Sequence, residues 1–224
     1  MEYVEIARAE SERGELVLRE RRPENGPTTL ELRANGVFVM DTLEVSTEQA
    51  LADSALAQVS EPRAVVVGGL GLGFTMHEVL ADSRVEKCAV VEIEQALVDW
   101  MRDGTIQQGP ALLADERVTV VVADIADALA EAPPASYDLV LLDVDNGPGY
   151  LVHDSNARLY REPFLRTART ALRPGGAIAI WSAAEEPDLV EALGRVFDSA
   201  EGYVHDVLLQ DRDEQYWLYV ARVS

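Results

Sequence analysis

A glycine-rich turn and a distant glutamate form the first group of residues that could do chemistry. An apolar run at 65–67 leads directly into six residues that include four glycines, and a helix is predicted to begin near Phe74. Such a turn lets a ligand approach the backbone, and the helix N-terminus offers free N–H groups. Glu92 ends the next apolar run, 21 residues after Gly71, a spacing that suits hydrogen bonds to both hydroxyls of a ribose. We therefore expect a nucleoside site made by Gly68, Gly69, Leu70, Gly71, Leu72, Gly73, Glu92 and Ile93.

Two more acidic residues follow later apolar runs. Asp124 comes after the run at 118–122, where it could accept a hydrogen bond from the exocyclic amine of adenine, with Ile125 against the ring. Asp143 follows the run at 139–142. Ligands of open α/β sheets bind outside the carboxyl ends of the strands, where the strand order reverses. We therefore expect Glu92, Asp124 and Asp143 to converge on one site.

The elements that must position these residues alternate between strands and helices. Short, β-branched, nearly continuous apolar runs are typical of parallel strands buried on both faces. They occur at 64–67, 88–93, 118–122, 139–144 and 177–181. Helical spacing lies between them, including one predicted helix from Leu159 to Leu172 that a turn at 173–176 ends. A helix at 188–197 and two strands at 204–209 and 216–223 close the chain. The pattern predicts a doubly wound, mostly parallel α/β sheet of seven strands.

The N-terminal part has a different pattern. Residues 29–33 alternate with period two, Asn35-Gly36 supplies a hairpin turn, and an apolar run returns at 37–40. We expect a small antiparallel β appendage over residues 1–45. A connecting helix from Ser46 or Thr47 would then lead into a Rossmann-like nucleoside-binding catalytic domain over 46–224.

Composition excludes several classes of function. The 224 residues contain 40 acidic and 19 basic side chains, a formal charge of −21, and Lys87 is the only lysine. Binding to nucleic acid or to an anionic membrane would need a concentrated basic face, so neither is expected. A single cysteine, Cys88, excludes an internal disulfide, and its apolar neighbours predict a buried thiol. The three histidines lack the spacing of metal ligands, so we expect no metal. Without a leader-like N-terminus or a long apolar stretch, we expect a soluble, cytoplasmic protein.

The order of these motifs resembles that of class I S-adenosylmethionine-dependent methyltransferases, and residues 28–183 resemble the spermidine synthase (polyamine aminopropyltransferase) family. The matching stretches are Asn35-Gly36 through Met40-Asp41, residues 67–73, Val91-Glu92-Ile93-Glu94, Ala123-Asp124, residues 137–143 and residues 172–176. The resemblance implies the Rossmann-like methyltransferase fold and S-adenosylmethionine, or its decarboxylated form, as the donor. It also implies a homodimer, with Asp143 as the catalytic residue that accepts the proton of an attacking amine.

The chain departs from the family in the half of the site that holds the diamine. Leu70 or Leu72 stands where the family has an aspartate for the amine end of the nucleotide, and Glu44 replaces a glutamine. The family's D-S-S-D-P loop reads Asp143-Val144-Asp145-Asn146-Gly147, and its Asp-Glu-x-x-Tyr segment reads Glu48-Gln49-Ala50-Leu51. We place the acceptor among Glu44, Asp145, Asn146, Tyr150, His153 and Trp181, with residues 150–154 as a possible lid.

These observations lead to one functional prediction with open alternatives. We expect an S-adenosylmethionine-type alkyltransferase that moves a methyl group to a small amine or hydroxyl acceptor, because the aspartate that would select the decarboxylated donor is missing. Aminopropyl transfer to a polyamine is one alternative, and a non-catalytic nucleoside-binding protein is another. A nicotinamide-dependent oxidoreductase also fits the glycine turn and Glu92, but the acids after the third and fourth strands fit it poorly.

Overall fold

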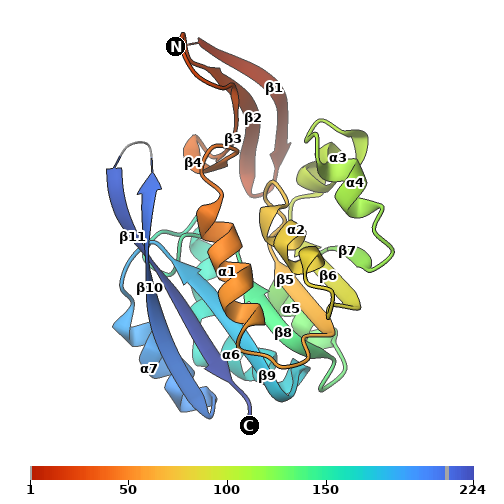
Figure 1. Ribbon diagram of the computed structural model, residues 1–224, viewed down its shortest axis with the longest axis vertical. Coiled ribbons are helices and arrows are strands. Elements are labelled where there is room, and N and C mark those ends of the chain that lie inside the picture. The colour runs from red at the N-terminus through yellow and green to blue at the C-terminus, as the bar shows by residue number, and fades with distance from the viewer. Residues whose placement is uncertain (1, 210–211) are drawn as a thin grey trace.

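Two β-sheets organise the chain (Figure 1). The computed structural model describes residues 2–209 and 212–224. Within them, a four-stranded antiparallel sheet at the N-terminus lies against one end of a seven-stranded, mostly parallel sheet. Helices cover both faces of the larger sheet, which is the predicted doubly wound α/β architecture.

The N-terminal sheet is a meander of four strands joined in sequence order. Its strands are β1 (Glu2–Ser11), β2 (Gly14–Arg22), β3 (Thr29–Ala34) and β4 (Val37–Asp41). The Asn35-Gly36 turn joins β3 to β4 with both residues at positive φ, 51° and 76°, as a tight hairpin requires. Leu18 and Leu32 face the interior and join the hydrophobic core beneath the larger sheet, so the two sheets pack together.

The larger sheet runs in the order β10-β11-β9-β8-β5-β6-β7. Its strands are β5 (Ala64–Gly68), β6 (Lys87–Glu92), β7 (Val118–Val122), β8 (Tyr137–Leu142), β9 (Leu172–Ser182), β10 (Ser199–Leu209) and β11 (Arg212–Arg222). The strands β5 to β9 pair in parallel, and β11 is antiparallel to both β9 and β10. Because the chain turns outward from β5 in both directions, the strand order reverses between β5 and β8, where a ligand crevice is expected.

Helices pack on the two faces of this sheet (Figure 1). One face is covered by α1 (Ser46–Leu56), α2 (Phe74–Ala81), α3 (Gln95–Asp103) and α4 (Gly109–Leu113). The other is covered by α5 (Ile125–Glu131), the 3₁₀ helix η1 (Asp154–Tyr160), α6 (Glu162–Ala171) and α7 (Pro187–Val196). Alternate strand residues serve the two cores: Val65 and Val67 pack on the α1 side, and Val66 packs on the α6 side. This is why the strands read as continuous apolar runs.

The segment 159–176 differs from the sequence expectation. The predicted single helix is two helices, because Arg161 is extended (φ −108°, ψ 154°) between η1 and α6. Pro163 stands in the first turn of α6, a position where its missing N–H costs nothing. The next strand, β9, begins directly at Leu172, so Pro174 and Gly175 lie inside it and not in a turn before it.

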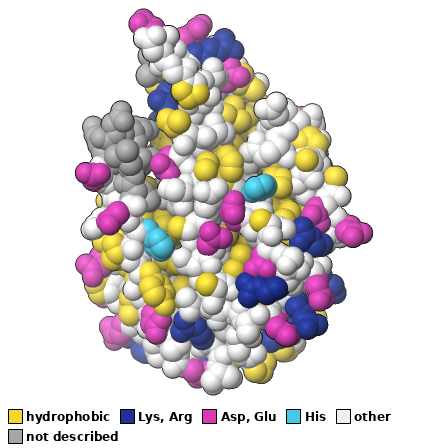
Figure 2. Space-filling model, viewed as in Figure 1, with side chains coloured by type: hydrophobic (Ala, Val, Ile, Leu, Met, Phe, Trp, Pro, Cys, Tyr) yellow, Lys and Arg dark blue, Asp and Glu magenta, His cyan; other side chains and the backbone are white. Residues whose placement is uncertain are grey.

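The surface matches the acidic composition. On the face shown in Figure 2, arginines occur singly or in small groups among acidic side chains. No helix within the described residues is long and apolar enough to cross a lipid bilayer.

Candidate functional site

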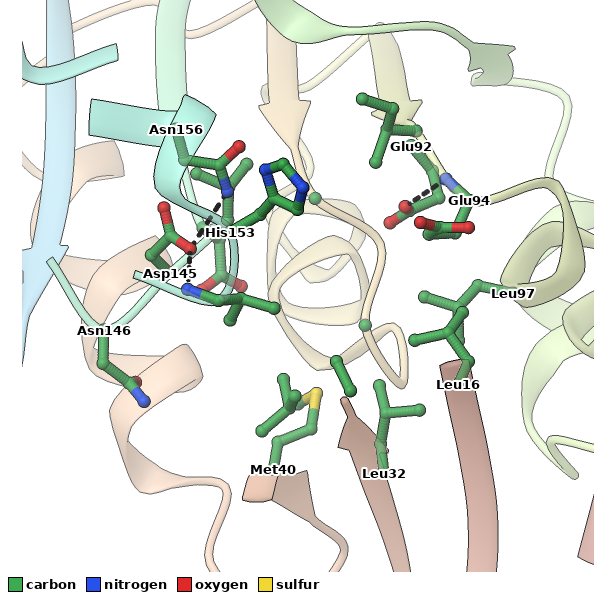
Figure 3. Close-up of a pocket in the computed structure, with 18 of the residues that line it drawn as sticks. Leu16, Leu32, Met40, Glu92, Glu94, Leu97, Asp145, Asn146, His153 and Asn156 are labelled. Atoms are coloured by element: carbon green, nitrogen blue, oxygen red, sulfur yellow. Dashed lines mark hydrogen bonds between the residues drawn. The ribbon is translucent and has the colours of Figure 1, made fainter. Parts of the chain in front are cut away.

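A cavity of about 230 Å³ opens at the carboxyl ends of the parallel strands, between the larger sheet and the N-terminal sheet. Figure 3 shows Glu92 and Glu94 on one side, with Asp145, His153 and Asn156 on the other. Loops after β5, β6 and β8 contribute to the lining, as do the N-terminal sheet and α1. The crevice therefore lies where the strand order reverses, as expected for this topology.

The glycine-rich turn is shaped by close backbone contacts. Gly69 has φ 97°, and a Cβ there would come within 2.0 Å of the Asp143 carbonyl oxygen. Gly71 has φ 48°, and a Cβ would come within 2.6 Å of the Met40 sulfur. Both positions line the cavity, and the absence of side chains lets the turn approach the loop after β8 at Gly69 and strand β4 at Gly71.

Glu92 is a buried carboxylate held in a fixed orientation. It is 6% exposed, and its two oxygens accept hydrogen bonds from the backbone N–H groups of Glu94 (2.7 Å) and Leu70 (2.9 Å). Burial raises the pKa of Glu92, and these two N–H groups oppose that rise. Each carboxylate oxygen has a second lone pair, so both oxygens can still accept hydrogen bonds from hydroxyl groups of a ligand.

Asp124 has a structural partner on each oxygen. One oxygen accepts the Ala126 N–H at 2.9 Å and caps α5, and the other forms a hydrogen-bonded ion pair with Arg158. Asp124 and Ile125 both line the cavity beside the Glu92 side. The N-cap contact is the ordinary structural role of an aspartate at this position.

Asp143 and Glu48 form the acidic centre of the cavity. Thr75 donates a hydrogen bond to Asp143 at 2.7 Å, while burial raises the pKa of that aspartate. Glu48 comes from α1 and accepts a hydrogen bond from the Thr47 hydroxyl at 2.5 Å. Burial, followed by the nearby charge of Asp143, raises the pKa of Glu48 to about 7. Each carboxylate disfavours ionisation of the other, and a cation between them would relieve that repulsion.

Asp145 is fully engaged by its own loop. It is 7% exposed and accepts hydrogen bonds from the Val152 N–H (2.7 Å), the Asn156 amide (3.0 Å) and the Tyr160 hydroxyl (3.2 Å). Burial raises its pKa, and the hydrogen bonds oppose the rise. The structure therefore shows Asp145 closing the loop that follows β8, with its lone pairs turned largely toward protein.

Two aromatic rings form one wall of the cavity. Trp181, from β9, stacks on Tyr216, from β11, with ring centroids 5.3 Å apart and planes 19° apart. Both residues line the cavity together with Glu44 and Glu48. Aromatic faces beside carboxylates attract an organic cation.

Most of the residues selected from the sequence meet in this one cavity. Those that line it are Gly69, Gly71, Glu92, Ile93, Asp124, Ile125, Asp143, Glu44, Asp145, Asn146, His153 and Trp181. Those that do not are Gly68, Leu70, Leu72, Gly73 and Tyr150. Leu70 and Leu72 turn their side chains into the hydrophobic core, and Tyr150 is 61% exposed outside the cavity.

Sequence reasoning also missed residues that line the cavity. Tyr216 packs against the hydrophobic core and also lines the cavity, and nothing in its own strand pattern distinguishes it from an aromatic that only packs. Glu48 was considered only as a remnant of a motif, although an acid in the first turn of a predicted helix was a usable signal. Arg13 and Asn156 carry no local signal, because tertiary packing alone brings them to the cavity.

The lining is strongly acidic. Among the described residues, Arg13 is the only arginine or lysine that lines the cavity. The acidic residues that line it are Glu15, Asp41, Glu44, Glu48, Glu92, Glu94, Asp124, Asp143 and Asp145. Concentrated negative charge in a partly enclosed cavity favours cationic ligands.

Comparison with known families gives the context of this arrangement. The spermine/spermidine synthase domain model matches residues 44–196, which include α1, Glu92, Asp143 and Trp181. The chain belongs to the spermine/spermidine synthase family. The resemblance inferred from the motifs is therefore confirmed.

Curated relatives of the family include two kinds of transferase. Polyamine aminopropyltransferase 2 of Pseudomonas aeruginosa is 32% identical over 136 residues, which cover 59% of this chain and 37% of that protein. A polyamine aminopropyltransferase of Synechococcus is 32% identical over 170 residues, covering 69% and 52%. Putrescine N-methyltransferase 4 of Nicotiana tabacum is 34% identical over 128 residues, covering 55% and 30%. The chain thus spans about half, or less, of the length of these relatives.

Solved structures share the fold. The spermidine synthase of Thermotoga maritima superposes with a TM-score of 0.81 at 20% identity, over 97% of this chain and 72% of that one. Human methyltransferase-like protein 13, solved with S-adenosylhomocysteine, superposes with a TM-score of 0.61 at 20% identity, over 80% and 82%. The first of these confirms the expected spermidine synthase fold, including its small N-terminal sheet.

Proposed function

We propose that this protein transfers an aminopropyl group from decarboxylated S-adenosylmethionine to an amine of a small polyamine. The acidic lining of the cavity carries the proposal. The decarboxylated donor has a sulfonium and an ammonium group and no carboxylate, and a polyamine is also cationic. Three of the nine lining acids, Glu15, Asp41 and Asp124, pair with arginines outside the lining. The remaining acids, with Glu48 and Asp143 at the centre, still suit two such cations better than a donor that bears a carboxylate.

The donor would lie along the loops after β5, β6 and β7. Glu92 is oriented by two backbone N–H groups and can accept both ribose hydroxyls. Ile93 and Ile125 supply apolar surface for adenine, while Asp124 accepts its exocyclic amine beside the Arg158 contact. The sulfonium would then be directed toward Asp143 across the glycine-rich turn.

Asp143 would act as the proton acceptor in an in-line displacement. The amine nitrogen attacks the carbon of the aminopropyl group that is bonded to sulfur. The new N–C bond forms as that C–S bond breaks, and methylthioadenosine leaves as a neutral thioether. The proton lost by the nitrogen goes to Asp143, directly or through water. The Thr75 hydrogen bond at 2.7 Å holds that carboxyl in place, and positioning contributes much of the catalysis in a reaction of this kind.

Glu48, Glu44 and the Trp181–Tyr216 pair would hold the acceptor. A second ammonium group of the polyamine can lie between the two glutamates and against the aromatic faces. The carboxylates also counter the loss of hydration of that cation. Asp145 is not included among these contacts, because its own loop already occupies it.

Methyl transfer from S-adenosylmethionine to the same class of amine is the second candidate. Leu70 and Leu72 are buried in the core, so the glycine-rich turn offers no acid to the amine end of the donor. The similarity to putrescine N-methyltransferases supports the same alternative. The two candidates share the acceptor site and differ only in the donor.

The products separate the candidates. The protein would be incubated with each donor and a panel of diamines and triamines, and the released nucleoside would be quantified by chromatography. Release of methylthioadenosine from the decarboxylated donor is expected. Release of S-adenosylhomocysteine from S-adenosylmethionine alone would replace aminopropyl transfer by methyl transfer. Tight nucleoside binding without either product would indicate a non-catalytic nucleoside-binding protein. The expected homodimer is a separate proposal, which light scattering would test.

A further inference from the structure

The tip of the first hairpin reaches the mouth of the cavity. Ser11 and Gly14 pair at the ends of β1 and β2, which leaves Arg13 in the turn between them. The Arg13 side chain lines the cavity although it comes from the far N-terminal sheet. It is 23% exposed, in contrast to Arg8 of the same hairpin, which is 45% exposed and pairs with Glu5 and Glu15.

Arg13 joins two sides of the cavity that are otherwise formed by separate loops. On the donor side its Nε lies 3.7 Å from Glu94, two residues after Glu92, and the Ser11 hydroxyl donates to the same carboxylate at 3.1 Å. On the opposite side, its guanidinium donates to the Asn156 side-chain oxygen at 3.0 Å and to the Ser155 hydroxyl at 3.4 Å. Figure 3 places Glu94 and Asn156 across the cavity from each other.

Asn156 links Arg13 to the loop that follows β8. Its amide donates to Asp145 at 3.0 Å, and Asn156 is 9% exposed. The chain Arg13–Asn156–Asp145 therefore runs from the hairpin tip to the loop that begins at Asp143. Each member is held by a side-chain hydrogen bond, so displacement of Arg13 would loosen the loop as well as the mouth.

The hairpin tip is itself built to hold this position. Asn35, in the β3–β4 turn, donates to the Arg13 carbonyl at 3.1 Å and accepts the Glu15 N–H at 3.0 Å. Gly14 has φ 112°, and a Cβ there would come within 1.8 Å of the Asn35 side chain. A second turn thus braces the first, which a solvent-exposed hairpin end does not require.

We propose that Arg13 is a positioning residue that closes the cavity over the donor nucleoside and orders the loop carrying Asp145. The inference rests on the proposed donor site, since it assigns Arg13 to the retention of that nucleoside. A closed mouth excludes water from the sulfonium and slows the release of the nucleoside. The N-terminal sheet is then part of the active site and not only a support for it.

Methylthioadenosine is the probe, because it contains the nucleoside without an amino-acid tail. Its affinity and dissociation rate would be measured by calorimetry and stopped-flow fluorescence for the wild type, Arg13→Gln and the matched control Arg8→Gln. Arg13→Gln is expected to raise the dissociation rate and the Kd about fivefold to tenfold, less than the loss of a charged hydrogen bond made directly to the ligand, because Arg13 acts through Asn156 and Glu94. Arg8→Gln is expected to change neither. Arg13→Gln combined with Asn156→Ala should be less than additive, because the two residues act in one chain.

The outcomes distinguish this inference from the proposed function. Failure of the wild type to bind methylthioadenosine would overturn the donor site and Arg13 with it. Normal wild-type binding, with no effect of Arg13→Gln in a variant of unchanged melting temperature, would overturn the role of Arg13 alone. Loss of S-adenosylhomocysteine affinity with unchanged methylthioadenosine affinity would overturn it as well, by assigning Arg13 to the amino-acid tail. In turnover, a donor KM raised with a smaller change in kcat is expected.

Discussion

Neutralising Glu48 should stabilise the protein, and the gain should increase as the pH rises from about 5 to above 7. Glu48 lies in α1 beside Asp143, and burial together with that neighbouring charge raises its pKa from 4.5 to about 7. In the folded protein the carboxyl therefore keeps its proton over a pH range in which the unfolded chain has lost it. Glu48→Gln preserves the shape of the side chain and keeps an oxygen that can accept the hydrogen bond from the Thr47 hydroxyl.

Linkage gives the sign and the size of the effect. Between pH 4.5 and about 7 the folded state binds more protons than the unfolded state, so stability falls as pH rises. The difference between the two pKa values corresponds to about 3 kcal/mol, since one pKa unit is worth about 1.4 kcal/mol. A glutamine side chain does not ionise, so the variant does not lose stability in this way. Relative to wild type, Glu48→Gln should raise the free energy of unfolding by about 1 kcal/mol or less at pH 5 and by about 3 kcal/mol at pH 8.

Urea unfolding at pH 5, 6.5 and 8 measures the free energy of unfolding for both proteins. Asp53→Asn is the matched control, because it makes the same chemical change at an exposed position of the same helix. A Glu48→Gln variant that is destabilised at pH 8, or that shows the same difference at all three pH values, would refute the reasoning. The variant should also bind the polyamine acceptor less tightly, since activity and stability oppose each other at this position.

Two further predictions test the site, and a third tests the hydrophobic core. Glu92→Ala should weaken methylthioadenosine binding by about 1.5–3 kcal/mol, the scale of hydrogen bonds to a charged group; unchanged affinity by calorimetry in a folded variant would contradict the ribose assignment. Asp143→Asn should lower turnover by roughly 10²–10⁴ while keeping most methylthioadenosine affinity, and equal rates in wild type and variant would remove Asp143 from the mechanism. Burial raises the pKa of the Cys88 thiol to about 12, so the native protein should resist alkylation by iodoacetamide at pH 8. Rapid labelling, followed by mass spectrometry, would contradict that burial.

The sequence predicts the strands of this fold well because both faces of the sheet are covered. A strand such as β5, with Val65 and Val67 in one core and Val66 in the other, must be apolar throughout. Parallel pairing then brings the ends of β6 and β8 to one edge, so Glu92 and Asp143 meet without any further information. The donor half of the site follows from strand order alone.

The acceptor half depends on packing that no local pattern records. Tyr216 reaches Trp181 only because β11 pairs antiparallel with β9, and its spacing along β11 is that of any core aromatic. Arg13 and Asn156 are 143 residues apart in the chain and meet through the N-terminal sheet. The helix boundary at Arg161 was missed for a related reason, since apolar spacing continues across it while Pro163 starts a new helix.

The glycine-rich turn shows how this chain differs from its family within an unchanged fold. Leu72 points into the core, and its backbone N–H donates to the Met40 sulfur at 3.3 Å. Gly71 leaves the space that Met40 fills, because a Cβ there would collide with the sulfur. The turn therefore directs neither an acid nor the N–H of Leu72 at the tail of a donor. Glu48 on α1 and Asp143 after β8 line the same cavity and supply carboxylates for that role. A donor whose tail ends in an ammonium group is matched by those carboxylates, whereas a tail carboxylate would be repelled by them.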